Sequence, residues 1–437
     1  MKSICFGTDG IRGIYGEEIT DETAFRLGTV LGKKGTLILA RDNRLSSPRL
    51  AAAFLGGVAS TGGRCRYIGQ ATTPSLYYVH THTDTAYAVM ITASHNPPSH
   101  NGLKVFYKGE KLSKADREEV AAEMTALPVE DVFYREISEE PEALDGYRTF
   151  FGNAVGDLSG VRAVVDYAGG AGGVFGDLLS SLGAEVSSLN LLGSGEKINV
   201  GCGALHPEAV RAETVKRKAD IGFALDGDGD RIVAVTKEGD VLDGDALLYI
   251  LARKRKEKGT LRKNRIALTV MTNSGVLRSL SDLSIEVTLC GVGDSAVTAA
   301  MRSEGLTLGG EQSGHIVLGD LMMTGDGLLV GGKLMQMIKR GDRLIKPKEL
   351  IVYPQALLNV PVHDRKVAAL PEVHALAMRL KESAGAGRIL VRASGTENVV
   401  RVMAECPNRR LAEKFAREIA TCVKEKDEAF FGRKATD

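Results

Sequence analysis

A chain of 437 residues is too long for one ordinary hydrophobic core, and its length suggests about three domains. Hydrophobic residues make up 43% and charged residues 25%, which is the composition of a soluble globular protein and excludes a disordered or fibrous chain. The 56 Lys and Arg residues nearly balance the 55 Asp and Glu residues, so we expect no nucleic-acid partner.

The N-terminus and the cysteines indicate the compartment. The first residues, MKSICFG, are soon followed by Asp9 and Arg12, which leaves no room for the apolar core of a signal peptide. No apolar run is long enough to span a bilayer, so we expect no membrane partner. The six cysteines are scattered without CxxC pairs, which is typical of free thiols in a reducing compartment. We therefore expect a cytoplasmic protein.

One pattern occurs three times along the chain. An apolar strand, a turn, a helical stretch and a second strand follow one another in residues 36–69, 161–190 and 265–293. This alternation is typical of βαβ units with a largely parallel sheet. Because the three copies are widely spaced, they predict three similar α/β domains in tandem rather than one large sheet.

The C-terminal segment follows a different pattern. Residues 388–405 predict a β-hairpin, and residues 411–425 have apolar side chains at helical spacing. We expect a smaller α+β domain here. Residues 351–366 are expected to lead into it as irregular chain, because Pro354 and Pro361 interrupt regular structure.

A group of carboxylates follows the strand-like segment IGFAL. In the motif DGDGDR, Asp226, Asp228 and Asp230 occupy alternate positions, which lie on one face of an extended segment. The glycines between them let the backbone curl, so that the three side chains can meet. Unpaired carboxylates repel one another, and a hard cation with oxygen ligands, most suitably Mg²⁺, would relieve that repulsion.

Three other interpretations of this motif fit less well. An EF-hand requires Gly and Glu at the positions that Arg231 and Lys237 occupy. A phosphatase of the DxDx[TV] type requires Thr or Val in place of Asp230. A solvated polar turn remains the alternative, although three aspartates and an arginine directly after a buried strand disfavour it.

The motif TASHNP ends another predicted strand and offers a nucleophile, Ser94. His95 is expected to point away from Ser94, because adjacent residues of an extended chain face opposite sides. The GxSxG elbow of an α/β-hydrolase is absent. A simple turn built from Ser, Asn and Pro is the alternative. Lys104 adds a cation shortly downstream.

Three further stretches are suited to a sugar phosphate. FGTDGIRG places Arg12 among glycines, which let backbone amides approach an anion, with a flexible turn as the alternative. The loop GEQSGH offers Glu, Ser and His for hydrogen bonds to hydroxyls or an amine. A hairpin tip near the C-terminus is a candidate phosphate clamp, with a charged turn as the alternative. The residues of this clamp are Arg392, Ser394, Gly395, Thr396 and Arg401.

Together and in this order, the five motifs resemble those of the α-D-phosphohexomutase family, over residues 6–405. The fold that this resemblance implies is α/β with four domains around a central cleft. The first three are similar βαβ-based mixed sheets, and the fourth is a smaller α+β domain with a hinge near residues 360–364. The implied domains are a phosphoserine domain at 1–150, a magnesium-binding domain at 151–252, a sugar-recognition domain at 253–362 and a phosphate-binding domain at 363–437.

The resemblance also implies an intramolecular phosphotransferase. Ser94 would be phosphorylated, one Mg²⁺ per chain would bind Ser94 and the three aspartates, and a sugar bisphosphate would be the primer and intermediate. The implied catalytic residues beside Ser94 are Arg12, His95 and Lys104. The implied substrate-binding residues are Arg231, Glu311, Ser313 and His315. The clamp residues Arg392, Ser394, Gly395, Thr396 and Arg401 would hold the phosphate that is not transferred.

Two segments, GEQSGH and INVGCG followed by HPE, resemble the branch of the family that acts on phosphoglucosamine and leads toward UDP-N-acetylglucosamine. We therefore expect interconversion of glucosamine 6-phosphate and glucosamine 1-phosphate by a monomer or homodimer. The segment RLSSP equally resembles phosphomannomutases, so hexose phosphates are the alternative substrates, and a non-catalytic sugar-phosphate-binding protein is a further alternative. Ser295 stands where the family commonly has Arg or Lys, so a cation near the substrate is absent or is supplied from elsewhere.

Overall fold

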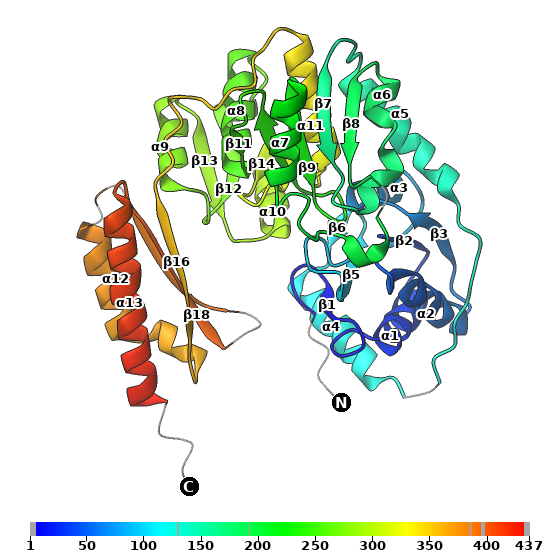
Figure 1. Cartoon of the computed structure of the whole chain (residues 1–437). Coiled ribbons are helices and arrows are strands. Elements are labelled where there is room, and N and C mark those ends of the chain that lie inside the picture. Colours follow the sequence, from blue (N-terminus) through cyan, green and yellow to red (C-terminus); the bar gives the residue numbers. More distant parts are fainter. Residues whose placement is uncertain are drawn as a thin grey trace. The chain divides into compact units, whose positions relative to one another are not determined.

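The computed structural model describes residues 6–128, 131–191, 193–383, 385, 387–394 and 398–431. The chain forms two compact units (Figure 1). The first comprises Met1–Met271 and Glu286–Lys346, and the second comprises Thr272–Ile285 and Pro347–Asp437. None of the helices in the described part has an apolar stretch that would let it traverse a bilayer.

The first unit begins with a mixed sheet in the order β1-β5-β4-β2-β3, with the short β6 paired to β5. β2 runs parallel to β3 and β4, whereas β5 runs antiparallel to β4 and β1. Because β2 and β4 are parallel neighbours, the loops that follow them leave the same edge of the sheet. The strands are β1 (Ile11–Ile14), β2 (Leu37–Arg41), β3 (Cys65–Gln70), β4 (Tyr87–Ile91), β5 (His100–Tyr107) and β6 (Glu110–Lys111).

Two local sequence features explain where the first helix beside this sheet begins and how closely it packs against the second. Thr20 caps the first helix in a capping box with Thr23. The first two helices lie so close that a Cβ on Gly28 would come within 2.1 Å of the Phe54 carbonyl oxygen, so a larger residue there would separate them. The helices are α1 (Asp21–Gly32), α2 (Ser47–Ser60), α3 (Thr73–Thr81) and α4 (Lys114–Ala126).

A second mixed sheet has the order β11-β10-β9-β7-β8. β7 runs parallel to β8 and β9, and β10 runs antiparallel to β9 and β11. Its strands are β7 (Arg162–Asp166), β8 (Glu185–Leu189), β9 (Ile221–Leu225), β10 (Ile232–Thr236) and β11 (Val241–Leu242). The helices of this part are α5 (Asp145–Val155), α6 (Leu178–Ser181), α7 (Glu208–Arg217) and α8 (Gly244–Glu257).

A third mixed sheet has the order β13-β12-β14-β15. β12 runs parallel to β13 and β14, and β15 runs antiparallel to β14. The strands are β12 (Arg265–Thr269), β13 (Glu286–Cys290), β14 (Leu308–Gly310) and β15 (Ile316–Leu318), and the helices are α10 (Asp294–Glu304) and α11 (Gly327–Lys339). All three repeats therefore contain the predicted parallel strand pair within a mixed sheet.

The helix expected within the second repeat is reduced to two short pieces. A single-turn 3₁₀ helix spans Ala171–Phe175, and α6 has only four residues. Gly176 lies between the two pieces, and glycine loses more conformational freedom in a helix than any other residue. The prediction of one continuous helix here was wrong for that reason.

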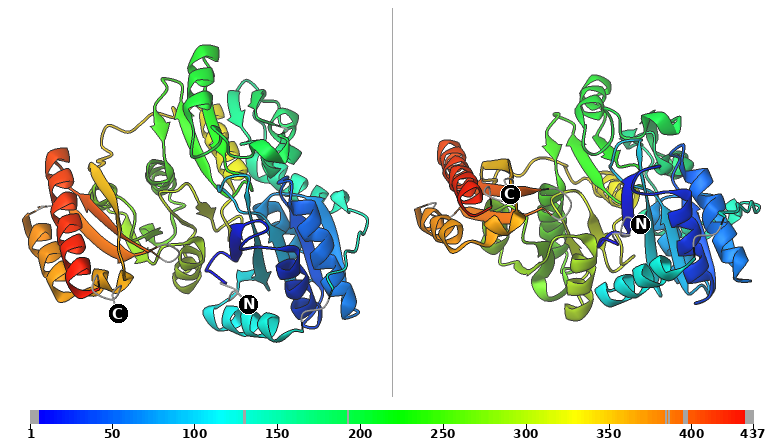
Figure 2. Two further views of the ribbon diagram at one scale, coloured as in Figure 1. Left: turned by 60° about the horizontal axis from the view of Figure 1, so that its bottom comes forward. Right: turned by 90° about the horizontal axis from the view of Figure 1, so that it is seen from below.

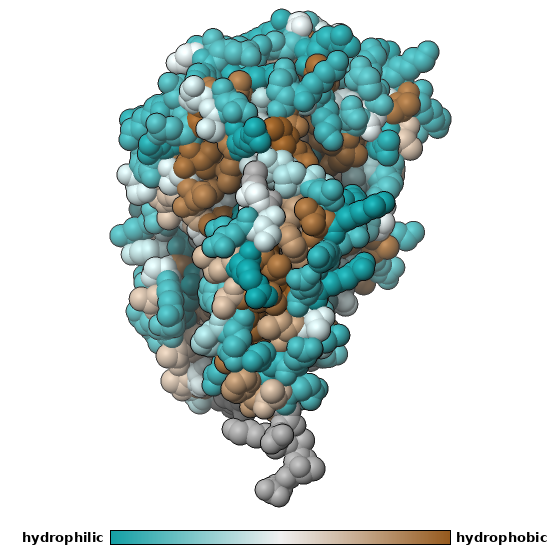
Figure 3. Space-filling model, turned by 90° about the vertical axis from the view of Figure 1, so that its left-hand side faces the viewer, coloured by the Kyte–Doolittle hydropathy of each residue, from teal (hydrophilic) through white to brown (hydrophobic). Residues whose placement is uncertain are grey.

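The second unit has a three-stranded antiparallel sheet in the order β16-β18-β17. Figure 2 shows α12 and α13 side by side on one face of this sheet, where Phe415 and Ile419 of α13 pack against Val400 and Val402. Some apolar side chains of this unit remain exposed, and Figure 3 shows apolar residues set among hydrophilic ones on the face it presents. The elements are α9 (Ser274–Asp282), β16 (Gln355–Pro361), α12 (Pro371–Ser383), β17 (Arg388–Ala393), β18 (Val399–Glu405) and α13 (Arg409–Phe430).

The segment 351–366 is more regular than its prolines predicted. Residues 355–361 form β16, which pairs with β18 along its whole length, and Pro361 ends it at a sheet edge, where proline is tolerated. The segment 360–364, where a hinge was expected, therefore lies inside the second unit, and the last passage of the chain from the first unit to the second falls between Lys346 and Pro347. The backbone N–H groups of His363 and Asp364 also donate to the Asp427 carboxylate of α13.

A buried histidine makes the stability of the first unit dependent on pH. His80 on α3 is only 2% exposed, its Nε2 accepts a hydrogen bond from the Gly109 N–H at 3.1 Å, and burial lowers its pKa to about 4. Because the unfolded chain binds a proton near pH 6.5, stability is expected to fall as the pH drops from about 6.5 toward 4, by about 1–3 kcal/mol. Urea unfolding at several pH values measures this effect. The free energy of unfolding of His80→Gln, which has no titratable ring, should fall less steeply with decreasing pH than that of the wild type. An equally steep fall would contradict this assignment.

Candidate active site

The three aspartates of the DGDGDR motif meet in one buried cluster. They follow β9, they are at most 4% exposed, and one carboxylate oxygen of each lies within 4.8 Å of those of the other two. One oxygen of Asp228 and one of Asp230 are buried and accept no hydrogen bond from the protein. Since a buried carboxylate oxygen without a donor costs free energy, these two oxygens are suited to coordinating a cation.

Lys104 on β5 brings its ammonium group into direct contact with this cluster. Its Nζ lies 2.5 Å from an oxygen of Asp228 and 2.9 Å from an oxygen of Asp230, and the side chain is 1% exposed. Thr73 also donates to Asp228, at 2.5 Å. Lys104, with Arg231 at 3.9 Å from the other Asp230 oxygen, offsets only part of the negative charge that three ionised carboxylates would carry, so the cluster can still attract a cation.

The pKa shifts of Asp226 and Asp230 indicate that the cluster would be stabilised by further positive charge. Burial, together with the charges of Asp230 and Asp228, raises the pKa of Asp226 well above its usual value. Burial also opposes ionisation of Asp230, but Lys104 and His315 hold its pKa well below the usual value. Three oxygen ligands on a tight turn, with two oxygens free, fit Mg²⁺, and their chemistry disfavours soft metals, which prefer sulfur.

Ser94 lies against these aspartates in the turn after β4. Its hydroxyl donates to an oxygen of Asp226 at 2.5 Å, and the residue is 1% exposed. Its φ is +52°, a left-handed conformation that is uncommon for a residue other than glycine and costs about 1–3 kcal/mol where it is strained. The surrounding structure must therefore hold the turn in place.

The expectation that His95 points away from Ser94 was wrong. The His95 Nδ1 lies 3.3 Å from the Ser94 hydroxyl oxygen. The prediction assumed an extended backbone, whereas the left-handed conformation of Ser94 brings the two side chains to one side. Burial, with Arg231 and Arg12 nearby, lowers the pKa of His95 to about 4, so the ring is neutral near pH 7.

Arg44 and Asn199 hold the serine turn from two sides. The Arg44 guanidinium is fully buried and donates to the carbonyl oxygens of Ser94 at 2.8 Å and Asn96 at 2.9 Å. The Asn199 amide donates to the same two oxygens, at 2.8 and 3.1 Å. Asp42 accepts from the Arg44 Nε at 2.9 Å and so balances its charge. These contacts account for the stability of the left-handed turn.

Arg44 reaches further along the same loop and joins two strand ends. Its Nη1 also donates to the carbonyl oxygens of Pro97 at 2.5 Å and His100 at 3.0 Å. The Arg44 loop follows β2, whereas the serine turn follows the parallel neighbour β4, so sheet topology brings them together. Arg44 was noted in the motif RLSSP only as an indicator of substrate, and nothing in that motif alone assigns this contact.

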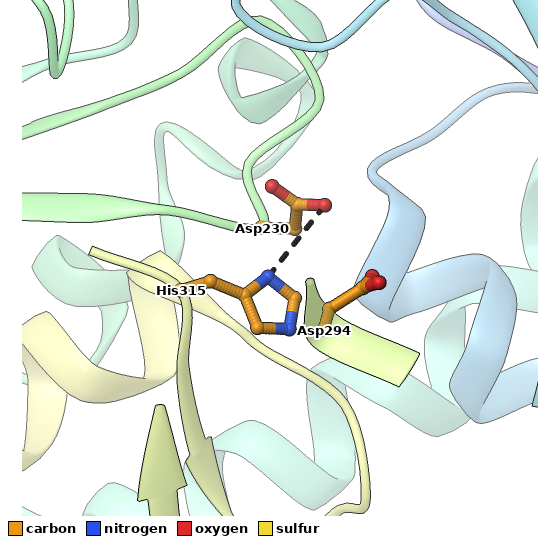
Figure 4. Close-up of side chains that lie close together, drawn as sticks. All are labelled: Asp230, Asp294 and His315. Atoms are coloured by element: carbon orange, nitrogen blue, oxygen red, sulfur yellow. Dashed lines mark ion pairs between the residues drawn. The ribbon is translucent and has the colours of Figure 1, made fainter. Parts of the chain in front are cut away.

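His315 faces Asp230 from the third sheet (Figure 4). The Gly325 N–H donates to the His315 Nε2 at 3.2 Å, which leaves the proton on Nδ1, 3.8 Å from an oxygen of Asp230. Burial lowers the pKa of His315, but Asp230 outweighs this effect and raises it overall. Asp294 completes this group of three, and because its carboxylate pairs with Lys111, the group is better described as an ion-pair network than as a second cation site.

The other predicted residues of the first unit surround the same aspartates. Arg12 pairs with Asp9, and the backbone N–H of Arg231 donates to Asp226 at 3.1 Å. Glu311, in the turn between β14 and β15, accepts from the Gly293 N–H at 3.0 Å. Ser313 is exposed in that turn, and in the described part of the chain no contact of its side chain with the aspartates is found.

Lys111 is a candidate that the sequence did not single out. It lies on β6 and forms ion pairs with Asp9 of the FGTDGIRG segment and with Asp294 at the start of α10. Burial lowers its pKa, but the two carboxylates outweigh this effect and raise it. Lys111, Ser295 and His315 line one small cavity of about 20 Å³. Lys111 thus places a cation beside Ser295.

The predicted phosphate clamp lies in the second unit. Arg392 and Arg401 are directly paired across β17 and β18, which places two like charges side by side and favours an anion between them. Ser394 is buried, and its carbonyl oxygen accepts from the Arg365 Nη1 at 2.8 Å. Gly395 and Thr396 lie outside the described residues.

Comparison with known proteins identifies the family. Models of the phosphoglucomutase/phosphomannomutase proteins match this chain with alpha/beta/alpha domain I at residues 3–129, alpha/beta/alpha domain III at 243–353 and the C-terminal domain at 357–421. A Bacillus licheniformis protein named phosphoglucosamine mutase is 39% identical over 442 residues, covering 96% of this chain and 98% of its own. The chain belongs to the phosphohexomutase family.

Other relatives and solved structures of the family agree. A Limosilactobacillus fermentum protein, also named phosphoglucosamine mutase, is 34% identical and covers 97% of this chain and 99% of its own. A Burkholderia thailandensis phosphoglucomutase/phosphomannomutase family protein shares the fold, with a TM-score of 0.80, 24% identity and coverage of 97% and 98% of the two chains. An Aspergillus fumigatus N-acetylphosphoglucosamine mutase, solved with GlcNAc-6P and magnesium, has a TM-score of 0.62 at 20% identity, with coverage of 89% and 82%.

Within this phosphohexomutase, Lys111→Met should weaken both folding and substrate binding. Its loss leaves Asp9 and Asp294 without a shared cation, which is expected to lower the free energy of unfolding by about 1–3 kcal/mol. The same carboxylates would then repel a sugar phosphate, so we expect KM to rise by about tenfold with a smaller change in kcat. Steady-state kinetics and urea unfolding measure the two effects.

A second substitution separates a local charge effect from a general loss of structure. Ser295→Lys in the Lys111→Met background returns a cation to the same small cavity and should recover part of the KM. Lys114→Met, which changes an exposed lysine just beyond β6, is the matched control and should behave as the wild type. A wild-type KM in Lys111→Met would contradict a role for this cation.

Proposed function

We propose that this protein interconverts glucosamine 6-phosphate and glucosamine 1-phosphate through a phosphorylated Ser94. The observation that carries the proposal is the contact between the Ser94 hydroxyl and Asp226, at the edge of three buried carboxylates. It places a candidate nucleophile against a candidate magnesium site. The names of the relatives that span nearly the whole chain support phosphoglucosamine as the substrate.

The proposed reaction has two phosphoryl transfers. The free hydroxyl of glucosamine 6-phosphate attacks the phosphorus of phosphoserine, its O–P bond forms as the Ser94 O–P bond breaks, and its proton passes to a base. The product is a glucosamine bisphosphate. The intermediate then reorients, and Ser94 attacks the phosphorus of its 6-phosphate. The Ser94 O–P bond forms again as the bond from phosphorus to O6 breaks, O6 takes up a proton, and glucosamine 1-phosphate leaves. A trace of sugar bisphosphate primes enzyme whose Ser94 lacks phosphate.

The residues of the first unit divide this work. Asp226, Asp228 and Asp230 would hold one Mg²⁺ together with Ser94, and the ion would supply positive charge to the transferring phosphoryl group. Phosphoryl transfer asks the protein mainly for positioning and charge neutralisation. Lys104 already contacts two of the carboxylates, and His95, neutral near pH 7, can accept a proton beside Ser94.

Further residues would orient the sugar and its second phosphate. Glu311, Ser313 and His315 suit the sugar hydroxyls or amine, while Arg12 and Arg231 add positive charge. We assign the retained phosphate to the clamp of the second unit, formed by Arg392, Ser394, Gly395, Thr396 and Arg401. In this proposal the chain has a phosphoserine domain at 1–150, a magnesium domain at 151–252, a sugar domain at 253–362 and a phosphate domain at 363–437.

The proposal also covers the setting of the reaction. All described cysteines, among them Cys65 and Cys202, are free thiols, which supports a cytoplasmic protein. A monomer or a homodimer would suffice, because the proposed chemistry draws on one chain.

A substrate panel tests the proposal. Glucosamine, mannose and glucose 6-phosphates are compared with Mg²⁺ and a trace of the matching bisphosphate, and each reaction is repeated after chelation of the metal. We expect the highest kcat/KM with glucosamine 6-phosphate and loss of turnover on chelation, restored by added Mg²⁺. Preference for a hexose phosphate would overturn the substrate assignment, and absence of turnover with all three would favour a sugar-phosphate-binding protein.

A further inference from the structure

A cavity of about 250 Å³ lies between α8 and α11, lined also by the chain that follows β15. It is built by residues of the first unit that the proposed reaction does not use. Its apolar floor includes Leu251, Leu318 and Met337. The volume is slightly below the range of drug-sized sites, so it suits a small ligand.

The charge of this cavity is unbalanced. Five cations line it against a single carboxylate, and they are Lys254, Arg255, Lys258, Lys333 and Arg340 opposite Asp320. Within the described residues, Arg255 pairs with Asp320 at 2.9 Å, and Lys254 pairs with Asp342 at 2.6 Å and with Glu257 at 3.2 Å. The other three cations have no carboxylate partner there.

The neighbouring cations of the cavity affect the protonation of Lys333. Its Nζ donates to the Ala154 carbonyl oxygen at 3.0 Å and to the Gln336 side chain at 2.8 Å, both of which are neutral acceptors. Burial lowers its pKa, and Arg340, Arg255 and Lys258 lower it further, more than Asp320 can offset. The cations at the ends of α8 and α11 interact favourably with the helix dipoles, but that interaction does not require them to face one cavity.

This cavity is separate from the aspartate cluster. The N-terminal N–H groups of α8 and α11 contact loops of the candidate active site, through Gly244 to Gln312 and through Gly327 to Gly229. The cavity is lined by residues toward the opposite ends of the same helices. The lining begins at Leu251 of α8 and Lys333 of α11, so at a rise of about 1.5 Å per residue its near edge lies about 10 Å from the N-terminal ends of these helices.

We propose that this cavity binds a small phosphorylated metabolite with at least two negative charges. Lys258, Lys333 and Arg340 would hold its phosphate groups, and the apolar floor would contact the rest of the ligand. Arginine and lysine provide charge-assisted hydrogen bonds of the kind that phosphate oxygens accept. Binding at this cavity does not depend on which sugar the active site prefers, and only the control with glucosamine 6-phosphate rests on the proposed function.

Pyrophosphate is the probe, and two methionines report where it binds. The full-length protein carries methyl-labelled methionine, with Met337 and Met323 assigned from Met→Leu variants. Met337 lines the cavity, and Met323 lines the small cavity beside His315. At constant ionic strength, millimolar pyrophosphate should shift the Met337 signal to saturation. A Met337 signal that does not move would overturn the proposal.

Charge reversal tests whether the cations cause the shift. Lys258→Glu/Arg340→Glu should weaken the apparent binding of pyrophosphate at Met337 by about tenfold or more, while glucosamine 6-phosphate still moves Met323 as in the wild type. Lys33→Glu/Arg64→Glu reverses two exposed cations elsewhere in the unit and should leave the Met337 response unchanged. Equal Met337 binding in both double variants would overturn the proposal, and Lys258→Gln/Arg340→Gln repeats the test with less charge change.

Discussion

Ser94→Ala is expected to lower mutase turnover by at least about 10³-fold, because the variant has no oxygen to carry the phosphoryl group. Folding should be little affected, since the turn is held by backbone contacts to Arg44 and Asn199 rather than by the Ser94 hydroxyl. The turnover of glucosamine 6-phosphate and the urea midpoint measure the two expectations.

The neighbouring Ser99 provides the matched control. It is exposed in the same loop, and its hydroxyl contacts only His100 among the described residues, at 3.2 Å. Ser99→Ala should therefore keep wild-type turnover. If Ser94→Ala retains substantial turnover that still requires the primer, a residue other than Ser94 is the nucleophile.

Arg44→Met is expected to destabilise the first unit by about 3–5 kcal/mol, since it leaves the buried Asp42 carboxylate without its cation. It also removes the donors to four carbonyl oxygens of the serine loop. The left-handed conformation of Ser94 would then lose its main support, so turnover should fall more than the unfolded fraction explains. Urea unfolding and kcat of the folded fraction are the measurements.

Two further variants keep this prediction testable if Arg44→Met does not fold. Arg44→Lys retains the positive charge, but an ammonium group cannot donate hydrogen bonds to all four carbonyl oxygens as the planar guanidinium does. We therefore expect kcat to lie between those of the wild type and Arg44→Met, with a smaller loss of stability than in Arg44→Met. Arg64→Met alters an exposed arginine between α2 and β3 and should unfold and turn over as the wild type. If Arg44→Lys has wild-type kcat, Arg44 does not position the serine.

The strands around the site could be predicted from sequence because their patterns are local. The alternation of apolar strand and helix placed β2 and β3, β7 and β8, and β12 and β13 in parallel pairs, as found. The three aspartates were also identifiable, because their spacing, the glycines and the preceding strand all lie within one short segment. Two local predictions were wrong because single residues acted differently from what was expected. A glycine interrupts the helix near residue 175, and Pro361 ends a strand in a segment that was expected to be irregular.

The contacts between segments were beyond sequence reasoning. Arg44 meets the serine turn only because β2 and β4 are parallel neighbours, and Lys111 meets Asp294 only because β6 lies beside the start of α10. The orientation of His95 depended on one backbone angle at Ser94 that no pattern encodes. The sequence offered one signal, since Ser295 stood where the family commonly has a cation, which raised the question of which residue supplies that charge.

The central claim is that Ser94 passes its phosphoryl group to the sugar phosphate. The most direct test loads the protein with a sugar bisphosphate, locates the phosphate on its peptides by mass spectrometry, and then adds glucosamine 6-phosphate in a single turnover. We predict phosphate on the peptide that contains Ser94, and its transfer to glucosamine bisphosphate when the substrate is added. Release of inorganic phosphate without bisphosphate, or phosphate on another residue, would contradict the account.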